Sequence, residues 1–294
     1  MYQTPIKSGK PFNDKYVQEI ISDFKRDGFR LIPGVLDKDE VTALRERTDS
    51  LIADKEVVKA GYVQLVTRTE RLDEPYILRH TNELDRMFCD LLIREPIISL
   101  MESIFGPDVR QCGMNVLRND KSKAIDEWHI DDNLFFPLPD DIPHHDARID
   151  MPLFWLNVQI PLTDIESIEY GPTEFVPGSH YSGKHPPNKD DKLQFEGRDP
   201  VSIFCKAGDI YLHNPQCWHR GAPNQSDRVR YLLQNQYGPR WTSLRYNAYV
   251  KQKMPAHILE GASDRMLEVL DRMQFFPEQR YPSGYIHPDD KVGM

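Results

Sequence analysis

The first hundred residues carry apolar side chains at the spacing of amphipathic helices. Segment 13–27 begins with an Asn/Asp cap and precedes Gly28, so it predicts a helix that ends at this glycine. Its apolar positions are Tyr16, Val17, Ile20, Ile21 and Phe24. The same spacing recurs in segments 37–53, 82–92 and 96–105. Residues 29–34, between the first two helices, predict a short strand and a turn.

The pattern changes in the second third of the chain. Apolar runs become short, alternation replaces helical spacing, and turn residues recur roughly every ten positions, which is typical of a β-sandwich or barrel. Segments 154–162 and 228–237 each place apolar residues on one face and polar residues on the other. In the first segment the polar face contains Asn157 and Gln159. Such a face is either exposed to solvent or turned into a barrel interior, and one strand alone does not decide. Helical spacing returns in 256–273.

Composition and charge narrow the function classes. The chain has 294 residues, of which 39% are hydrophobic and 28% charged, as in a globular protein with a buried core. Its 46 acidic and 37 basic residues give a net charge of −9, which argues against nucleic-acid or anionic-membrane partners. No apolar run approaches the ~18 residues of a membrane span, and no signal peptide is recognisable. The 4 scattered cysteines predict reduced thiols, so we expect a cytoplasmic protein. We also expect a monomer or a homodimer.

The pattern His-x-Asp occurs at three places and introduces a metal hypothesis. The pairs are His129–Asp131, His144–Asp146 and His287–Asp289. Residues two apart on an extended segment point to the same side, so an imidazole and a carboxylate there can bind one ion. The first pair lies at a predicted strand end before an apolar loop, and we favour it. The second lies in a polar, proline-flanked stretch that predicts a surface position, and the third follows every candidate third ligand.

A third ligand would complete a facial triad of two histidines and one carboxylate, which leaves three metal positions open and suits non-haem Fe(II). Segment 207–221 offers His213 and His219, and spacing alone does not choose between them. Arg230 follows on the polar face of the next alternating strand. A guanidinium can bind a carboxylate through two hydrogen bonds, as holding a keto-acid co-substrate requires, although a lone strand arginine can equally form a structural ion pair.

Four stretches then occur in a recognisable order. They are His129-Ile130-Asp131, the Pro-Leu-Thr-Asp block at 161–164, the run from Tyr170 to His180, and Trp218-His219-Arg220-Gly221 leading to Arg230. Together they resemble the phytanoyl-CoA dioxygenase family of Fe(II)/2-oxoglutarate oxygenases over about residues 15 to 240. The 11-residue separation between His219 and Arg230 fits this family. Tyr170 departs from it, because the family commonly has Asn before the glycine.

The resemblance implies a mainly β fold with flanking helices. The expected architecture is a double-stranded β-helix, a cupin-like jelly-roll barrel, behind an N-terminal helical buttress. We expect one oxygenase domain over residues 1–294. Its parts would be a mostly helical buttress at 1–108, the jelly-roll core at 109–240, and a C-terminal helical cap and tail at 241–294.

The resemblance also assigns residues to a site. The implied Fe(II) ligands are His129, Asp131 and His219. Arg230 would bind the distal carboxylate of the co-substrate 2-oxoglutarate, and O₂ would be the oxidant. Thr173 and the inward-facing Gln159 are further candidate contacts to 2-oxoglutarate. The alternation of its strand also predicts that Gln111 points into this interior. The opposite register, in which Gln111 points outward, is a second possibility.

The activity implied by the resemblance is hydroxylation or another oxidation of a small-molecule metabolite, with release of succinate and CO₂. Asp131 favours this outcome, because related halogenases replace the carboxylate with a small residue. Two alternatives stay open: a metal-dependent cupin-like hydrolase or isomerase, in which Arg230 has no role, and a non-catalytic small-molecule-binding jelly roll. The substrate's identity does not follow from the sequence. Loop 131–150 carries six aspartates and one arginine, and we expect an acidic rim that suits a cationic or polyhydroxylated substrate.

Overall fold

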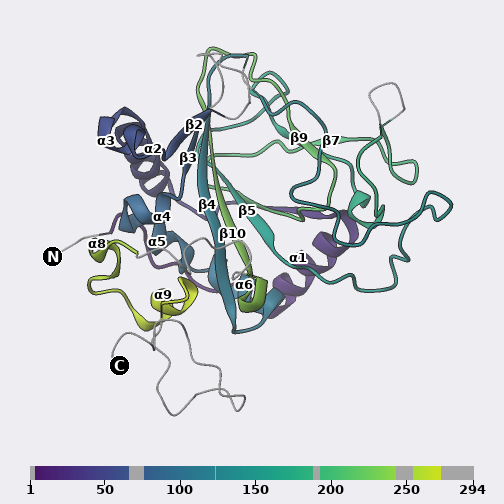
Figure 1. Cartoon of the computed structure of the whole chain (residues 1–294), viewed down its shortest axis with the longest axis horizontal. Helices are drawn as coiled ribbons and strands as arrows, with labels where there is room; N and C mark the ends of the chain where they lie inside the picture. The colour runs from purple at the N-terminus through teal and green to yellow at the C-terminus, as the bar shows by residue number, and fades with distance from the viewer. Residues whose placement is uncertain (1–3, 66–75, 123, 188–192, 243–253, 273–294) are drawn as a thin grey trace, which may run out of the picture.

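The computed structural model describes residues 4–65, 76–122, 124–187, 193–242 and 254–272 (Figure 1). Its strands form two antiparallel sheets, a larger one with the order β1-β8-β5-β10-β4-β3-β2 and a smaller one with the order β7-β6-β9. The strands are β1 (Phe29–Ile32), β2 (Val63–Leu65), β3 (Tyr76–Arg79), β4 (Val109–Asn119), β5 (Leu156–Pro161), β6 (Thr173–Phe175), β7 (Val201–Ser202), β8 (Ile210–His213), β9 (His219–Gly221) and β10 (Arg230–Pro239).

Helices cover the outer face of the larger sheet. They are α1 (Asp14–Asp27), α2 (Lys38–Ala53), α3 (Lys55–Lys59), α4 (Thr81–Leu84), α5 (Arg86–Leu92), α6 (Ile97–Phe105), α8 (Ala256–Leu259) and α9 (Asp264–Val269), with a short 3₁₀ turn η1 (Ser179–Tyr181) beside the smaller sheet. The main core lies between sheet and helices, where Ile20 of α1 shares a buried cluster with Val158 and Leu233. Figure 1 shows α8 and α9 beside α4 and α5. None of the described helices is both long and apolar enough to cross a membrane.

Helix α1 has the bounds that its sequence predicts. The Asn13 side chain accepts a hydrogen bond from the backbone N–H of Tyr16 and caps the first turn. Gly28 ends the helix with φ of 85°, in the left-handed region that favours glycine. A Cβ at this position would also lie 2.7 Å from Nδ1 of His180, so glycine is required for space as well as for conformation.

The expected fold class is confirmed, because the chain is mainly antiparallel β with flanking helices in a jelly-roll arrangement. The two sheets face each other without closing into the expected barrel. Leu117 and Tyr211 from the larger sheet and Phe175 from the smaller sheet meet in one buried cluster between them. His129 forms an isolated antiparallel bridge with His219, so the His-x-Asp segment extends the smaller sheet.

The N-terminal region contributes more than a buttress. β1, β2 and β3 all join the larger sheet, and only β1 was predicted, because strands of three or four residues show too little alternation to detect. The predicted helix at 82–92 is two helices, since Asp85 adopts an extended conformation and caps α5 with its side chain. Gly261, with φ of 64°, lies between the two short helices that replace the one predicted at 256–273. The expected single domain and its three parts stay a prediction.

Strand register brings the polar positions of β5 and β8 to the inner face of the larger sheet. Asn157 of β5 pairs with His213 of β8, and Gln159 pairs with Tyr211. Paired residues of antiparallel strands project to the same side. Asn157 and Gln159 are only 1% and 3% exposed, so the polar face of this strand is turned inward.

Candidate metal centre

Three side chains from two chain segments converge at one end of the space between the sheets. The ligand atoms of His129, Asp131 and His219 all lie within 4.8 Å of one another. Oδ1 of Asp131 is 3.9 Å from Nε2 of His129 and 3.7 Å from Nε2 of His219. Among the described residues, this is the one such group of three or more histidine, cysteine or acidic side chains. Its geometry matches a facial set of two imidazoles and one carboxylate.

Backbone carbonyls fix which nitrogen of each histidine faces the centre. Nδ1 of His129 lies 2.7 Å from the carbonyl oxygen of Glu127, and Nδ1 of His219 lies 2.9 Å from that of Cys217. A carbonyl only accepts hydrogen bonds, so each Nδ1 carries the proton. The Nε2 atom of each histidine therefore carries a free lone pair that points toward Asp131. Metal-binding histidines use this arrangement.

The electrostatics keep His219 neutral. Its side chain is 7% exposed, and burial lowers its pKa to about 4, with His129 adding to the lowering and Asp131 opposing it. At neutral pH the imidazole is therefore uncharged, which is the form that donates a lone pair to a metal.

Asn157, which was not predicted as a site residue, positions the carboxylate. Its Nδ2 donates a hydrogen bond of 3.0 Å to Oδ2 of Asp131. This contact leaves Oδ1 directed at the two histidines. The backbone N–H of Asp131 also donates to the carbonyl of Pro215 at 2.8 Å, which fixes the segment next to the centre.

His213, the other candidate third ligand, lies beside the group and is not part of it. Its ring centroid is 4.1 Å from that of His219, and the side chain is fully buried. Burial first, and then the neighbouring histidines, lower its pKa well below the usual value. Nδ1 lies 3.5 Å from Nδ2 of Asn157 and 3.4 Å from Nε2 of Gln159, so the amides hold the ring.

Arg230 occupies a separate buried position at the start of β10. Its side chain is 5% exposed, and one terminal nitrogen donates to Oγ1 of Thr173 at 3.1 Å. Thr173 in turn lies 2.8 Å from the hydroxyl of Tyr211. Nε of Arg230 has no hydrogen-bond partner, and burial lowers the pKa of the guanidinium. Among the described residues no carboxylate pairs with Arg230, so the site contains a buried cation without a counter-charge.

Tyr211 was not predicted from the sequence as a site residue, although a signal was present. It lies two residues before His213, so alternation puts both side chains on the inner face of β8. The same reasoning identifies Asn157, which lies two residues before the predicted Gln159. The sequence placed Asn157 on the polar face of its strand, but neither Asn157 nor Tyr211 was predicted as a site residue.

The structure does not bring Gln111 to this site. Asn115 and Gln159 both pair with Gln234 and share the inner face, but the register shifts between Gln236 and Tyr237. The extra residue on β4 turns Gln111 to the opposite face. There its side-chain oxygen lies 3.4 Å from the amide nitrogen of Asn82, on α4. Gln159 itself stays inside, next to His213.

The second His-x-Asp pair, His144–Asp146, does not belong to a metal-binding group among the described residues. Nε2 of His144 lies 3.1 Å from a carboxylate oxygen of Glu196, and Asp146 forms an ion pair with Arg148. Both side chains are about a third exposed, at 35% and 37%. The pair at 287 and 289 lies outside the described residues.

Comparison with known proteins decides the family. The family model described as Phytanoyl-CoA dioxygenase (PhyH) matches residues 24–231, which is well over half of the chain. The chain belongs to the phytanoyl-CoA dioxygenase family. As a member of this family it is an enzyme of the non-haem iron, 2-oxoglutarate-dependent class, as its motifs predict.

Solved structures of similar fold include three enzymes with small-molecule ligands or pathways in their descriptions. The epimerase SnoN from nogalamycin biosynthesis, in complex with Fe³⁺, alpha ketoglutarate and nogalamycin RO, has a TM-score of 0.59 and 22% identity, over 77% of this chain and 85% of its own. The carbocyclase SnoK from nogalamycin biosynthesis has a TM-score of 0.58 and 21% identity, over 79% of this chain and 87% of its own. HygX from Streptomyces hygroscopicus, with nickel, 2-oxoglutarate and hygromycin B bound, has a TM-score of 0.57 and 20% identity, over 76% of this chain and 88% of its own. Identities at this level show a shared fold.

Tyr170, the residue at which the sequence departs from the expected motif, makes a cation–π contact. At Tyr170, where the family commonly has Asn, the guanidinium carbon of Arg228 lies 4.3 Å from the tyrosine ring centroid. Arg228 also donates to the backbone carbonyl of Asp164 at 3.0 Å. A cation–π contact therefore stands at the position where the motif usually has a polar amide.

Proposed function

We propose that the protein is an oxygenase that oxidises a small-molecule metabolite, with Fe(II) bound by His129, Asp131 and His219 and with 2-oxoglutarate as co-substrate. The observation that carries the proposal is the buried guanidinium of Arg230, which has no carboxylate partner among the described residues and lies in the same interior as the three ligands. A buried cation without a counter-charge costs several kcal/mol, on the order of a broken buried ion pair, unless an anion binds there. The distal carboxylate of 2-oxoglutarate is the anion that we assign to it.

The residues present fit this cofactor pair. Two neutral imidazoles and one carboxylate suit Fe(II) and leave three positions for exchangeable ligands. When bound, iron and 2-oxoglutarate would supply the chemistry that uses O₂ to oxidise a substrate C–H bond, with one oxygen atom entering succinate as CO₂ leaves and the other entering the product. Arg230 and Thr173 would orient the co-substrate, because Nε of Arg230 has no hydrogen-bond partner among the described residues and can donate to a carboxylate.

The protein's own contribution is orientation and exclusion of water. Asn157 holds the Asp131 carboxylate, and the carbonyls of Glu127 and Cys217 hold the histidine tautomers. The burial of His219 and Arg230 keeps bulk solvent from the interior, so charges there interact strongly.

The solved structures support a small-molecule substrate and leave its oxidation open, because their descriptions include an epimerase and a carbocyclase. Hydroxylation with release of succinate and CO₂ is our proposal for this chain. A cupin-like hydrolase or isomerase would leave Arg230 without a ligand, and a binding module would leave the convergence of the three metal ligands unexplained. The 4 cysteines are free and buried, which supports the proposed cytoplasmic location; a monomer or homodimer stays a prediction.

The test is the weak visible charge-transfer band that appears when 2-oxoglutarate binds an Fe(II) centre. We expect the band in anaerobic wild-type protein with Fe(II), and its loss at moderate 2-oxoglutarate concentration in Arg230→Ala. Arg228→Ala is the matched control, because Arg228 lies two residues earlier and is exposed. Absence of the band in the wild type, or an equal band in Arg230→Ala, would contradict the proposal.

A further inference from the structure

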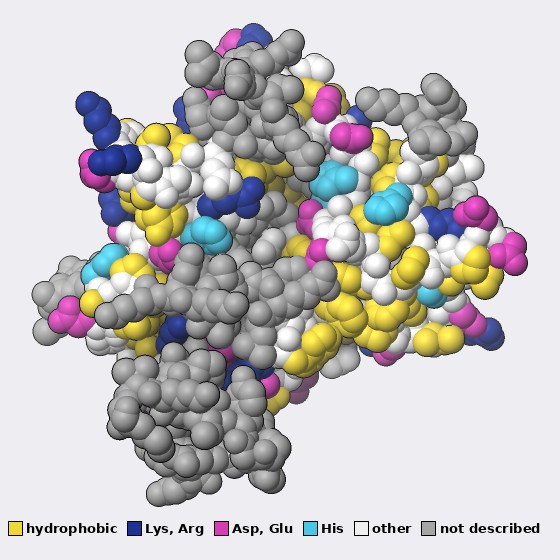
Figure 2. Space-filling view, in the orientation of Figure 1, with side chains coloured by type: hydrophobic (Ala, Val, Ile, Leu, Met, Phe, Trp, Pro, Cys, Tyr) yellow, Lys and Arg dark blue, Asp and Glu magenta, His cyan; other side chains and the backbone are white. Residues whose placement is uncertain are grey.

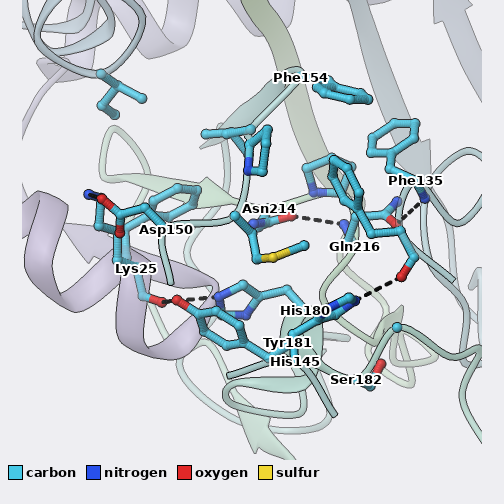
Figure 3. Close-up of a pocket in the computed structure, with 18 of the residues that line it drawn as sticks. Lys25, Phe135, His145, Asp150, Phe154, His180, Tyr181, Ser182, Asn214 and Gln216 are labelled. Carbon is cyan, nitrogen blue, oxygen red and sulfur yellow. Dashed lines mark hydrogen bonds and ion pairs between the residues drawn. The ribbon is translucent and has the colours of Figure 1, made fainter. Parts of the chain in front are cut away.

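A cavity lies beside the metal centre, between the helical layer and the loops. It has a volume of about 370 Å³. Helices α1 and α6, the loop from 134 to 154, the turn at 180–183 and residues 214–216 enclose it (Figure 3). Figure 2 shows hydrophobic side chains gathered on the face where α1 and its neighbouring loops lie. The volume is within the roughly 300–1,000 Å³ of small-molecule pockets.

Aromatic rings form much of the lining. Phe154 stands 4.7 Å from Phe135 and 5.5 Å from Phe136 between ring centroids, and Figure 3 shows Phe135 and Phe154 on one side of the space. Phe24 and Phe105 line it from the two helices. Rings in these mutual orientations bind a flat apolar group by stacking and edge contacts, and its burial there removes apolar area from water.

The polar groups of the lining indicate an uncharged ligand. Lys25 and Asp150 form an ion pair of 2.7 Å with both side chains more than half exposed, so their charges cancel at the solvent edge. Nε2 of His145 donates to the carbonyl of Phe136 at 2.8 Å. With the proton on Nε2, Nδ1 is an acceptor, and no side chain or backbone group among the described residues donates to it. A ligand hydroxyl is the group that would complete it.

This cavity is separate from the metal centre. Its described lining includes none of the three metal ligands and not Arg230. Gln216 forms part of the wall between them. Its side chain donates to the carbonyls of Asp131 and Asn133, at 3.3 and 3.1 Å, and accepts from the N–H of Phe135 at 3.0 Å. The loop that follows Asp131 is thereby fixed as a partition.

We propose that this cavity is a second small-molecule site, which takes a neutral molecule with a flat ring system and a hydroxyl at its edge. The volume, the aromatic lining and the acceptor on His145 together define this class. Binding there does not require turnover, so the proposal stands or fails independently of the oxygenase function.

The test uses 2-naphthol as the probe, titrated calorimetrically into the full chain both without additions and with Fe(II) and 2-oxoglutarate under anaerobic conditions. We expect saturable binding of one molecule in both states, because the probe and 2-oxoglutarate occupy different sites. Displacement by 2-oxoglutarate, or no saturable binding, would overturn the proposal.

Two matched substitutions locate the probe. Ser103 on α6 is exposed and lines the cavity, whereas Ser22 on α1 is exposed and does not line it. Ser103→Trp should fill the space and weaken 2-naphthol by at least about tenfold, a change of one decade in Kd. Ser22→Trp should leave binding unchanged. Equal affinity in both variants would place the probe elsewhere and contradict the site. Ile21→Trp, which enters the cavity from α1, replaces Ser103→Trp if that variant does not fold.

A third variant tests the hydroxyl contact. Wild-type protein should bind 2-naphthol more tightly than naphthalene, and His145→Phe should bind the two with equal affinity, because the acceptor is lost while the ring surface is kept. An unchanged preference in His145→Phe would show that His145 does not receive the hydroxyl and would refute the assigned ligand class.

Discussion

Asn157 connects the candidate metal ligands to the strand register beneath them. A carboxylate has two oxygens, and the one that faces a metal is decided by what holds the other. The amide of Asn157 holds Oδ2 of Asp131, and its position is set by pairing with His213 across β5 and β8. The geometry of the centre therefore depends on residues that would never contact the metal.

Asn157→Ala should weaken Fe(II) binding by about 10- to 100-fold, the usual effect of removing a residue that orients a ligand. Asn235→Ala is the control, because Asn235 is also buried but pairs with Val158, on the opposite face of the sheet. Anaerobic titration of both variants with Fe(II) gives the two affinities. Comparable losses in both would mean that general destabilisation, and not the contact with Asp131, explains the effect.

The two histidines of segment 207–221 give a second prediction at this scale. His219→Ala should abolish Fe(II) binding, because it removes one of the three converging ligand atoms. His213→Ala should keep binding, with some loss of fold stability from the cavity that it creates between the sheets. Equilibrium dialysis with Fe(II) separates the two outcomes, and the reverse result would show that His213 is the ligand.

At the scale of elements, the sequence predicts what is local and misses what pairing decides. α1 was predictable because Asn13 and Gly28 mark its ends within the segment itself. His129 and Asp131 were recognisable because two residues on one extended segment suffice to suggest an ion. Gln111 was misplaced because a bulge opposite Tyr237 reverses its side, and a bulge depends on the partner strand.

The loop after Asp131 shows the same limit. Gln216 holds this loop through three hydrogen bonds to residues more than eighty positions away in the sequence. No sequence motif predicts contacts of this kind. Gln216→Ala should free this loop and weaken Fe(II) binding several-fold, with a larger effect on the dissociation rate than on association, because the loop carries Asp131. Gln225→Ala, an exposed glutamine in another loop, is the control. Stopped-flow release of Fe(II) to a chelator measures the difference, and equal rates in wild type and Gln216→Ala would rule out this role.

At the scale of the molecule, the space between the sheets is polar where a structural core would be apolar. Arg230, His213 and Gln159 are buried there with atoms that lack hydrogen-bond partners. Each such group costs stability, on the order of 1–3 kcal/mol for an unsatisfied neutral donor or acceptor. The helical layer and its larger apolar core compensate on the other face of the sheet. The outer face of the larger sheet thus contributes most of the stability, and its inner face carries the polar groups of the candidate site.

The buried His213 and His219 and the half-buried His180 give a pH dependence of stability for the metal-free protein. Burial lowers the pKa of His180 and of His219 to about 4 each, and that of His213 well below its usual value. Histidine in the unfolded chain titrates near pH 6.5. Below this pH the unfolded chain therefore binds protons that the folded chain does not, and the folded protein becomes less stable as the pH is lowered. Each such histidine contributes at most about 1.4 kcal/mol per pH unit between pH 6.5 and its folded pKa.

Calorimetric melting between pH 7 and pH 5 should therefore show a falling Tm. The exposed carboxyls Asp37 and Asp227, whose pKa values are lowered by neighbouring lysines, do not contribute in this window because they titrate at lower pH. His180→Gln should reduce the slope, since glutamine can still donate to the carbonyl of Lys25 but does not titrate. His257→Gln, at a histidine exposed on α8, should leave the slope unchanged. A Tm that is constant from pH 7 to pH 5 would mean that these histidines are already protonated, or are hydrated, in the folded chain.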